Sequence, residues 1–151
     1  MHQTSEMRFR VTAPVEAAYE YFADLRHVPD YDPSVRSIQP TPPQGWDGSS
    51  FSMVFAPLGP WPKIPLTLAV EGCDPGRTLT YRIDGPRMSA RDHITFQFLG
   101  ADTEVTITTT FELRDPLAPA MFVYRALLPV MRRVRSRSTA RAVTEAYCRR
   151  W

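Results

Sequence analysis

The sequence predicts an α+β fold in which a seven-stranded, curved antiparallel sheet wraps around one long C-terminal helix. Two patterns carry this prediction. Short segments of alternating apolar and polar residues recur as far as residue 113, and the chain after Pro116 has helical periodicity. With 151 residues, 43% of them hydrophobic, the chain is expected to form a single domain over residues 1–151.

The N-terminal part predicts a strand followed by one or two short helices. A strand is expected over Glu6–Thr12, where apolar residues alternate with arginines. A helix should run from Pro14 to about Asp24, because apolar residues recur there at helical spacing. Arg26–Pro33 contains two prolines and is predicted to be a short helical turn or a loop.

Six further strands are expected, mostly joined by hairpins into one meander. They are predicted at Val35–Pro40, Phe51–Phe55, Leu66–Val70, Leu79–Ile83, Met88–Phe98 and Val105–Leu113. The proline-rich stretch Ala56–Pro65 should be a hairpin connection or a sheet edge, because proline cannot donate to a ladder. Gly72–Gly76 is expected to end the fourth strand.

The predicted C-terminal helix has an apolar stripe that must pack on the inner face of the sheet. The stripe consists of Leu128, Met131, Arg135, Ser138, Ala142 and Ala146. Small residues on this stripe, opposite Phe, Met and Ile on the sheet, predict an internal cavity. The alternative is that the sheet closes in until the interior reaches native packing density.

Charge is divided unevenly along the chain. Up to Asp115 there are ten basic and fifteen acidic residues, whereas from Pro116 onward eight arginines stand against Glu145 alone. The basic tail either contacts a phosphate or anionic surface or forms a solvated helix face. Because its arginines share one helix without interleaved aromatics, no nucleic-acid partner is expected.

Several classes of protein are disfavoured by what the sequence lacks. Cys73 and Cys148 are too far apart for a zinc site, and no nucleotide-binding or serine-hydrolase motif occurs, so neither a metal nor a cofactor is expected. The polar first ten residues do not form a signal peptide, and the apolar stretch Leu117–Met131 is interrupted and short of the roughly 20 residues that span a bilayer. We expect a cytoplasmic monomer or homodimer without stable membrane insertion.

Four segments of the chain carry a family resemblance. They are APVEAAYEYFADL (Ala13–Leu25), YDPSVRSI (Tyr31–Ile38), RTLTYRIDGP (Arg77–Pro86) and DHITFQFLGADTEVTITTTFEL (Asp92–Leu113). With the order of the elements, they resemble the START-like, Bet v 1-like (SRPBCC) superfamily, in its polyketide cyclase/dehydrase-type branch. The chain departs from relatives that often have tryptophan where it has Tyr31. The resemblance implies a helix-grip fold with a deep, mostly apolar pocket for a hydrophobic small molecule.

Three residues are candidates for catalysis. Asp92 lies between Ala90 and Ile94 on the predicted inner face, where an unpaired carboxylate is costly. It either moves a proton, lies at the wet end of the strand, or pairs with Arg91 or Arg82. Arg135 interrupts the apolar stripe and either binds a ligand oxygen, neutralises Asp92, or extends outward to solvent. The Tyr81 hydroxyl either orients a ligand carbonyl or finds a backbone partner.

The ligand itself should contact residues from all sides of the pocket. The predicted ligand-binding residues are Tyr19, Phe22, Tyr31, Met53, Phe55, Trp61, Leu68, Phe96, Ile107, Thr109, Met131 and Ser138. Trp61, in its proline-rich loop, either covers the pocket or only anchors its own loop.

Two functions compete at this stage. The first is a cofactor-independent polyketide cyclase, aromatase or dehydratase, a lyase or isomerase of secondary metabolism that works by acid–base chemistry and pocket shape. The second is a carrier that holds a lipid, isoprenoid or pigment without reacting it. A partner-binding domain with a collapsed interior is a third alternative. Resemblance of fold does not choose among them.

Overall fold

The computed structural model describes residues 2–32, 34–56, 63–114, 137, 140, 141 and 145. The strands are β1 (His2–Val11), β2 (Val35–Pro40), β3 (Ser50–Phe55), β4 (Ile64–Asp74), β5 (Thr78–Asp84), β6 (Met88–Leu99) and β7 (Asp102–Leu113). Three short helices lie between β1 and β2: α1 (Val15–Ala23), the 3₁₀ helix η1 (Leu25–His27) and α2 (Val28–Tyr31). The long helix predicted after Pro116 lies outside the described residues, apart from four helical positions at 137, 140, 141 and 145.

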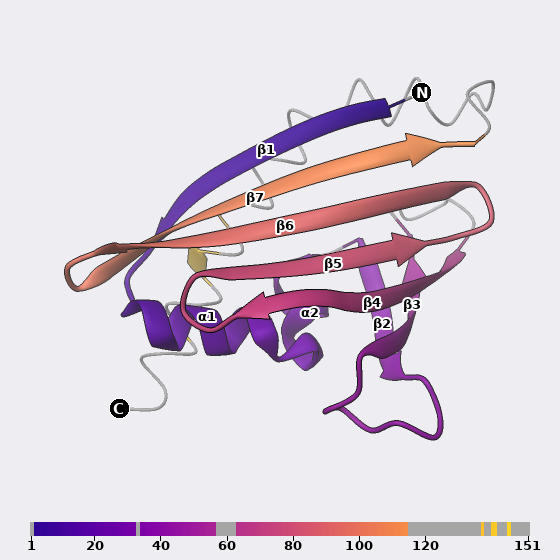
Figure 1. The fold of residues 1–151 in the computed structure, drawn as a ribbon, viewed down its shortest axis with the longest axis horizontal. Helices are drawn as coiled ribbons and strands as arrows, with labels where there is room; N and C mark the ends of the chain where they lie inside the picture. The colour runs from indigo at the N-terminus through magenta and orange to yellow at the C-terminus, as the bar shows by residue number, and fades with distance from the viewer. Residues whose placement is uncertain are drawn as a thin grey trace.

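The strands form a seven-stranded antiparallel sheet in the order β1-β7-β6-β5-β4-β3-β2. Strands β2 to β7 are therefore a continuous meander, and β1 closes the sheet by pairing with β7. This arrangement confirms the predicted sheet. Figure 1 shows the sheet strongly twisted and curved, with α1 and α2 together on one side of it.

Strand β4 differs from its predicted bounds at both ends. It begins at Ile64 and includes Pro65, which was expected to belong to a connection. At this point β4 is paired only with β3, through Pro65 and Val54, because its pairing with β5 starts at Thr67. A proline is tolerated there because its missing N–H faces an unpaired edge.

At its other end, β4 ends at Asp74, inside the Gly72–Gly76 segment that was predicted to end it. The pairing of β4 with β5 shifts register between Val70 and Gly72 and then resumes to Asp74. The shift marks a β-bulge next to Gly72, which was not predicted, and a bulge increases the local bend of a strand.

Helix α1 packs one face against the sheet. It begins after Pro14, whose φ of −62° suits the start of a helix, and it carries Glu16 in its first turn. Its buried residues are Ala18, Tyr21 and Phe22. Phe22 is 0% exposed and joins the sheet side chains in the main core cluster.

The far end of β6 extends beyond this core. The alternation along β6 predicted Phe98 to face inward, but its side chain is 67% exposed. Phe98 lies next to the β6–β7 turn at Gly100, whereas Phe96, two residues earlier, is 8% exposed and contacts α1 aromatics. Burial of the inner face therefore does not reach this end of β6.

Candidate functional site

A row of polar side chains crosses the inner face of the sheet. Tyr81 of β5 is the register partner of Asp92 on β6, and Asp92 is the register partner of Thr109 on β7. Apolar rows flank it on both sides, formed by Leu79, Ile94 and Ile107 and by Ile83, Ala90 and Phe111. We call Tyr81, Asp92 and Thr109 the polar row. All three point inward, as their sequence parity predicted.

The carboxylate of Asp92 is held by its cross-strand neighbour. The Thr109 hydroxyl donates a hydrogen bond of 2.6 Å to Asp92 Oδ1. The two arginines considered as partners from the sequence, Arg82 and Arg91, form ion pairs with Glu71 at 3.6 and 2.8 Å.

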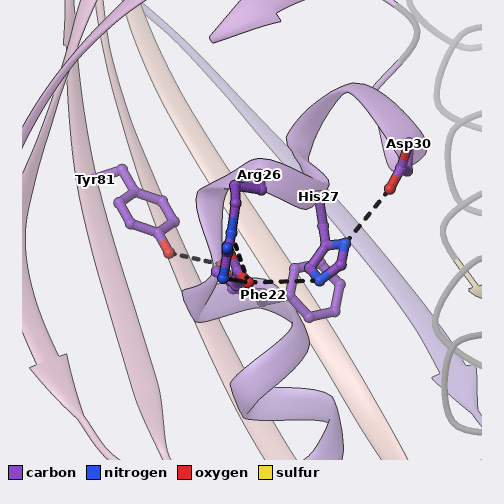
Figure 2. Close-up of polar contacts among 6 residues, drawn as sticks. Phe22, Arg26, His27, Asp30 and Tyr81 are labelled. Atoms are coloured by element: carbon purple, nitrogen blue, oxygen red, sulfur yellow. Dashed lines mark hydrogen bonds and ion pairs between the residues drawn. The ribbon is translucent and has the colours of Figure 1, made fainter. Parts of the chain in front are cut away.

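Tyr81 connects the polar row to the C-terminal end of α1 through a hydrogen bond. Its hydroxyl donates a 2.9 Å hydrogen bond to the carbonyl oxygen of Phe22, as Figure 2 shows. A carbonyl in the last turn of a helix has no partner within the helix, so this bond satisfies a buried acceptor. Burial, and then the nearby acidic groups of Tyr19 and Asp92, raise the pKa of the Tyr81 hydroxyl above its ordinary value. Tyr81 therefore stays protonated and acts as a donor at physiological pH.

The polar row lies in the wall of a cavity between the sheet and the helices. The cavity encloses about 90 Å³ within about 790 Å³ of unfilled space, part of which is open to solvent. The enclosed volume of about 90 Å³ is below the roughly 300–1,000 Å³ typical of small-molecule pockets. The described lining residues are Leu25, Val28, Tyr31, Asp32, Val35, Met53, Phe55, Leu66, Leu68, Tyr81, Ile83, Met88, Ala90, Asp92, Ile94, Ile107, Thr109 and Phe111.

Charged side chains contact one another on the outer side of the helices that line the cavity. This charged network consists of Asp24, Arg26 and His27. Arg26 donates to both carboxylate oxygens of Asp24, at 2.8 and 2.7 Å, and lies over the Trp46 ring at 5.8 Å. His27 stacks on Tyr21 with a ring separation of 4.3 Å and approaches Asp24 at 3.7 Å. Figure 2 shows its contact with Asp30, at 3.4 Å. The hydrogen bond from Arg26 is the main cause that holds the pKa of Asp24 below its ordinary value. This network fixes η1, whose Leu25 faces the cavity.

Asp32 is a cavity residue that the sequence did not single out. Its side chain is only 7% exposed and lines the cavity where α2 meets β2. The Asp-Pro-Ser sequence signals a turn in which Asp bonds to the backbone two residues later, and the Ser34 amide does donate to Asp32 Oδ1 at 3.0 Å. Nothing in that local signal shows that the carboxylate faces a cavity.

Half of the predicted ligand-binding residues line this cavity. They are Tyr31, Met53, Phe55, Leu68, Ile107 and Thr109, and the candidate catalytic residues Tyr81 and Asp92 join them. Tyr19, Phe22 and Phe96 are not brought to it; they pack on one another, with ring separations of 5.4 Å for Tyr19–Phe96 and 5.7 Å for Phe22–Phe96. The remaining four predicted residues, Trp61, Met131, Arg135 and Ser138, lie outside the described residues.

The described residues contain neither a candidate metal cluster nor a candidate membrane-spanning helix. Within the parts of the chain that the structure places, no three His, Cys, Asp or Glu residues gather closely enough to hold a metal ion. No helix among the placed residues is long and apolar enough to cross a membrane.

A curved antiparallel sheet, short helices after the first strand and an apolar cavity with a few polar groups define a small-molecule-binding class of protein. The family described as "Polyketide cyclase / dehydrase and lipid transport" matches residues 2–146. The chain belongs to this family. No curated protein sequence is significantly similar to it.

Solved structures agree on the fold. The chain is similar to the Zhui aromatase/cyclase from Streptomyces sp. R1128, with a TM-score of 0.74, 20% identity, and 99% of this chain and 96% of that chain covered. It is also similar to a START superfamily protein from Mycobacterium smegmatis, with a TM-score of 0.77, 13% identity, and 97% and 99% covered. A di-domain aromatase/cyclase from the steffimycin pathway matches with a TM-score of 0.72 and 16% identity, over 98% of this chain and 52% of that one.

Proposed function

We propose that the protein binds a hydrophobic small molecule in the cavity and catalyses cyclisation, aromatisation or dehydration of a polyketide-type substrate without a cofactor. The observation that carries this proposal is the polar row on an otherwise apolar cavity wall. The Thr109 hydroxyl holds the Asp92 carboxylate on this wall at 2.6 Å, where a carboxylate can take a proton from a bound substrate. The family and the aromatase/cyclase neighbours support the same choice.

The proposed chemistry assigns one role to each polar group. The Asp92 carboxylate removes a proton from a carbon between two carbonyls, and the resulting enolate carbon attacks a second carbonyl of the same chain. The new alkoxide takes back the proton held by Asp92. In the dehydration step the carboxylate removes a proton from the neighbouring carbon, a double bond forms, and the hydroxyl leaves with that proton as water. The cavity supplies the folded substrate conformation, which brings nucleophile and carbonyl close together.

Tyr81 has two compatible roles in this scheme. In the free protein its hydroxyl donates to the Phe22 carbonyl, which positions the end of α1 over the cavity. With substrate bound, the same hydroxyl is the candidate donor to the developing enolate oxygen, in exchange for that bond. Arg135, as a second candidate for this stabilisation, stays a prediction.

The experiment uses a synthetic 3,5,7-trioxo thioester and follows formation of its aromatic product by absorbance and mass spectrometry. General acid–base groups contribute roughly 10²- to 10⁴-fold to rate, so Asp92→Asn should lose at least about a hundredfold. Asp84→Asn is the matched control, because Asp84 pairs with Arg82 at 2.9 Å and does not line the cavity. Turnover by Asp92→Asn equal to that of the wild-type protein would contradict the catalytic role.

The second candidate function is a carrier of a lipid, isoprenoid or pigment, favoured by the apolar majority of the lining. Native mass spectrometry of the purified protein separates the two. A co-purified, chemically unchanged lipid or pigment, together with no turnover of the thioester, supports the carrier and overturns the enzyme.

A further inference from the structure

Thr109 interrupts an apolar series on the inner face of β7. The other inward-facing residues from 105 to 113 are Val105, Ile107, Phe111 and Leu113, each at most 9% exposed. The sheet does not require a hydroxyl among them, because valine has nearly the same shape as threonine and a similar preference for strands. The threonine at position 109 is therefore better explained by what its hydroxyl contacts.

The contact of that hydroxyl is the proposed catalytic base. Thr109 and Asp92 lie directly opposite each other on β7 and β6, and the hydroxyl donates to Asp92 Oδ1 at 2.6 Å. Cross-strand neighbours on one face keep their Cβ atoms roughly 4.5–5.5 Å apart, so the pairing of the strands maintains this contact. Threonine is also β-branched and rotates little about χ1, which gives the donor a fixed place.

The hydrogen bond restricts the rotation of the Asp92 carboxylate. The last side-chain torsion of an aspartate has a broad distribution, because it joins an sp³ carbon to an sp² carbon. A donor on the neighbouring strand holds one oxygen and thereby sets how the carboxylate faces the cavity, whatever the second oxygen contacts. This orientation matters for the proposed reaction, because a polyketide-type chain has several carbons that lie between two carbonyls. The carbon that loses its proton is the one that the carboxylate reaches in line.

We propose that Thr109 is a positioning residue, which orients the Asp92 carboxylate so that one carbon of the bound chain is deprotonated in preference to the others. This inference rests on the proposed function and adds to it a determinant of where on the substrate the reaction starts. It also differs from the ligand contact that the sequence predicted for Thr109. A ligand contact acts on KM, whereas a positioning residue acts on kcat and on the choice of product.

The test is Thr109→Val, assayed with the same 3,5,7-trioxo thioester for kcat, KM and the ratio of cyclised isomers by liquid chromatography and mass spectrometry. The kcat should fall by about tenfold to a hundredfold, since a small misplacement of reacting groups costs on the order of 10²-fold. The KM should stay within about twofold of the wild-type value, and the share of the main isomer should fall.

Two further variants separate positioning from a loss of structure. Thr109→Ser restores the hydroxyl and should recover most of the kcat and the wild-type ratio of isomers. Thr110→Val is the matched control, because it makes the same change at the next residue, which is exposed and points to the opposite face. Its kcat, KM and isomer ratio should equal those of the wild-type protein.

A double-mutant cycle shows whether Thr109 acts through Asp92. In the Asp92→Asn background, Thr109→Val should lower the remaining turnover by less than about twofold, because the carboxylate that it orients is already gone. The same tenfold or greater loss in that background would show that Thr109 acts on the substrate by itself, and it would overturn the positioning role.

The outcomes for the inference and for the proposed function are distinguishable. If the wild-type protein does not turn over the thioester, or if Asp92→Asn keeps wild-type turnover, both are overturned. If Asp92→Asn loses turnover while Thr109→Val keeps the wild-type kcat and isomer ratio, or changes only KM, the inference about Thr109 alone is overturned. Melting temperatures verify that the variants are folded, and Thr109→Ala, which removes the same hydroxyl, replaces Thr109→Val if that variant does not fold.

Discussion

Two rows of side chains cross the same three strands on opposite faces of the sheet. On the inner face lies the polar row of Tyr81, Asp92 and Thr109; one residue earlier or later in each strand, Thr80, His93 and Thr108 form the corresponding outer row. Each row contains a short polar contact, of 2.6 Å inside and 2.9 Å between Thr80 and His93 outside. The outer contact is exposed and competes with water, whereas the inner one lines an apolar cavity.

The comparison teaches that similar hydrogen bonds have different consequences on the two faces. On the outer face, polar residues suit a sheet surface that is in contact with water. Removing one of these side chains leaves no buried polar group without a partner. On the inner face, each polar group needs a hydrogen-bond partner in the protein or in a ligand, because an unsatisfied buried polar group costs free energy. This is why the inner row is informative about function and the outer row is not.

The largest difference should appear when an aromatic side chain is removed. Phe22→Ala is expected to lower the free energy of unfolding by about 3–5 kcal/mol, because Phe22 is fully buried between α1 and the sheet. Phe98→Ala, on the exposed end of β6, should change it by less than about 0.5 kcal/mol. Urea denaturation measures both, and a large loss for Phe98→Ala would show that the end of β6 is buried in solution.

A smaller difference is expected for single hydroxyl groups. Tyr81→Phe should cost about 1–3 kcal/mol, since it leaves the buried Phe22 carbonyl without its donor. Thr80→Val, which removes the exposed contact with His93, should cost less than about 0.5 kcal/mol. Equal costs for the two variants would mean that the Tyr81 hydroxyl is not buried against α1.

Asp24, at the junction of α1 and η1, should show an effect that depends on pH. Its carboxylate caps the Arg26 amide, so Asp24→Ala is expected to cost about 1 kcal/mol at pH 7. Because the pKa of Asp24 is lower in the folded protein than in the unfolded chain, its ionised form stabilises the fold above the unfolded pKa, and this contribution is lost as the pH falls through the folded pKa. The difference between wild type and variant should therefore shrink between pH 7 and pH 3 in denaturation experiments; a constant difference would contradict the ion pair.

The smallest effect should come from the outer ion pairs. Glu71 contacts both Arg82 and Arg91, and all three side chains reach solvent. Glu71→Gln is expected to cost between about 0 and 1 kcal/mol in low salt and nothing measurable in 1 M NaCl. A cost that persists in high salt would show that this face is shielded from water.

The sequence was sufficient where the pattern is periodic. Alternation in β5, β6 and β7 predicted the inward direction of Tyr81, Asp92 and Thr109, because a strand fixes the face of every second side chain. Alternation cannot show how far the covering helix extends, so Phe98 was predicted to face inward and is exposed. Asp32 was missed because it lies in a turn, where no periodicity relates sequence to burial. Pro65 was wrongly placed in a connection, and the bulge next to Gly72 was not predicted, because edge positions and bulges depend on the neighbouring strands.

Occupation of the cavity above the polar row can be measured directly by the isoleucine methyl groups. The chain has five isoleucines: Ile83, Ile94 and Ile107 line the cavity, whereas Ile38 and Ile64 do not. In a methyl-labelled sample titrated with 2-naphthol, the account predicts saturable shifts of the three cavity methyls and unchanged signals for the other two. Shifts of Ile38 and Ile64 alone, or no shift at any methyl, would contradict a ligand site in this cavity.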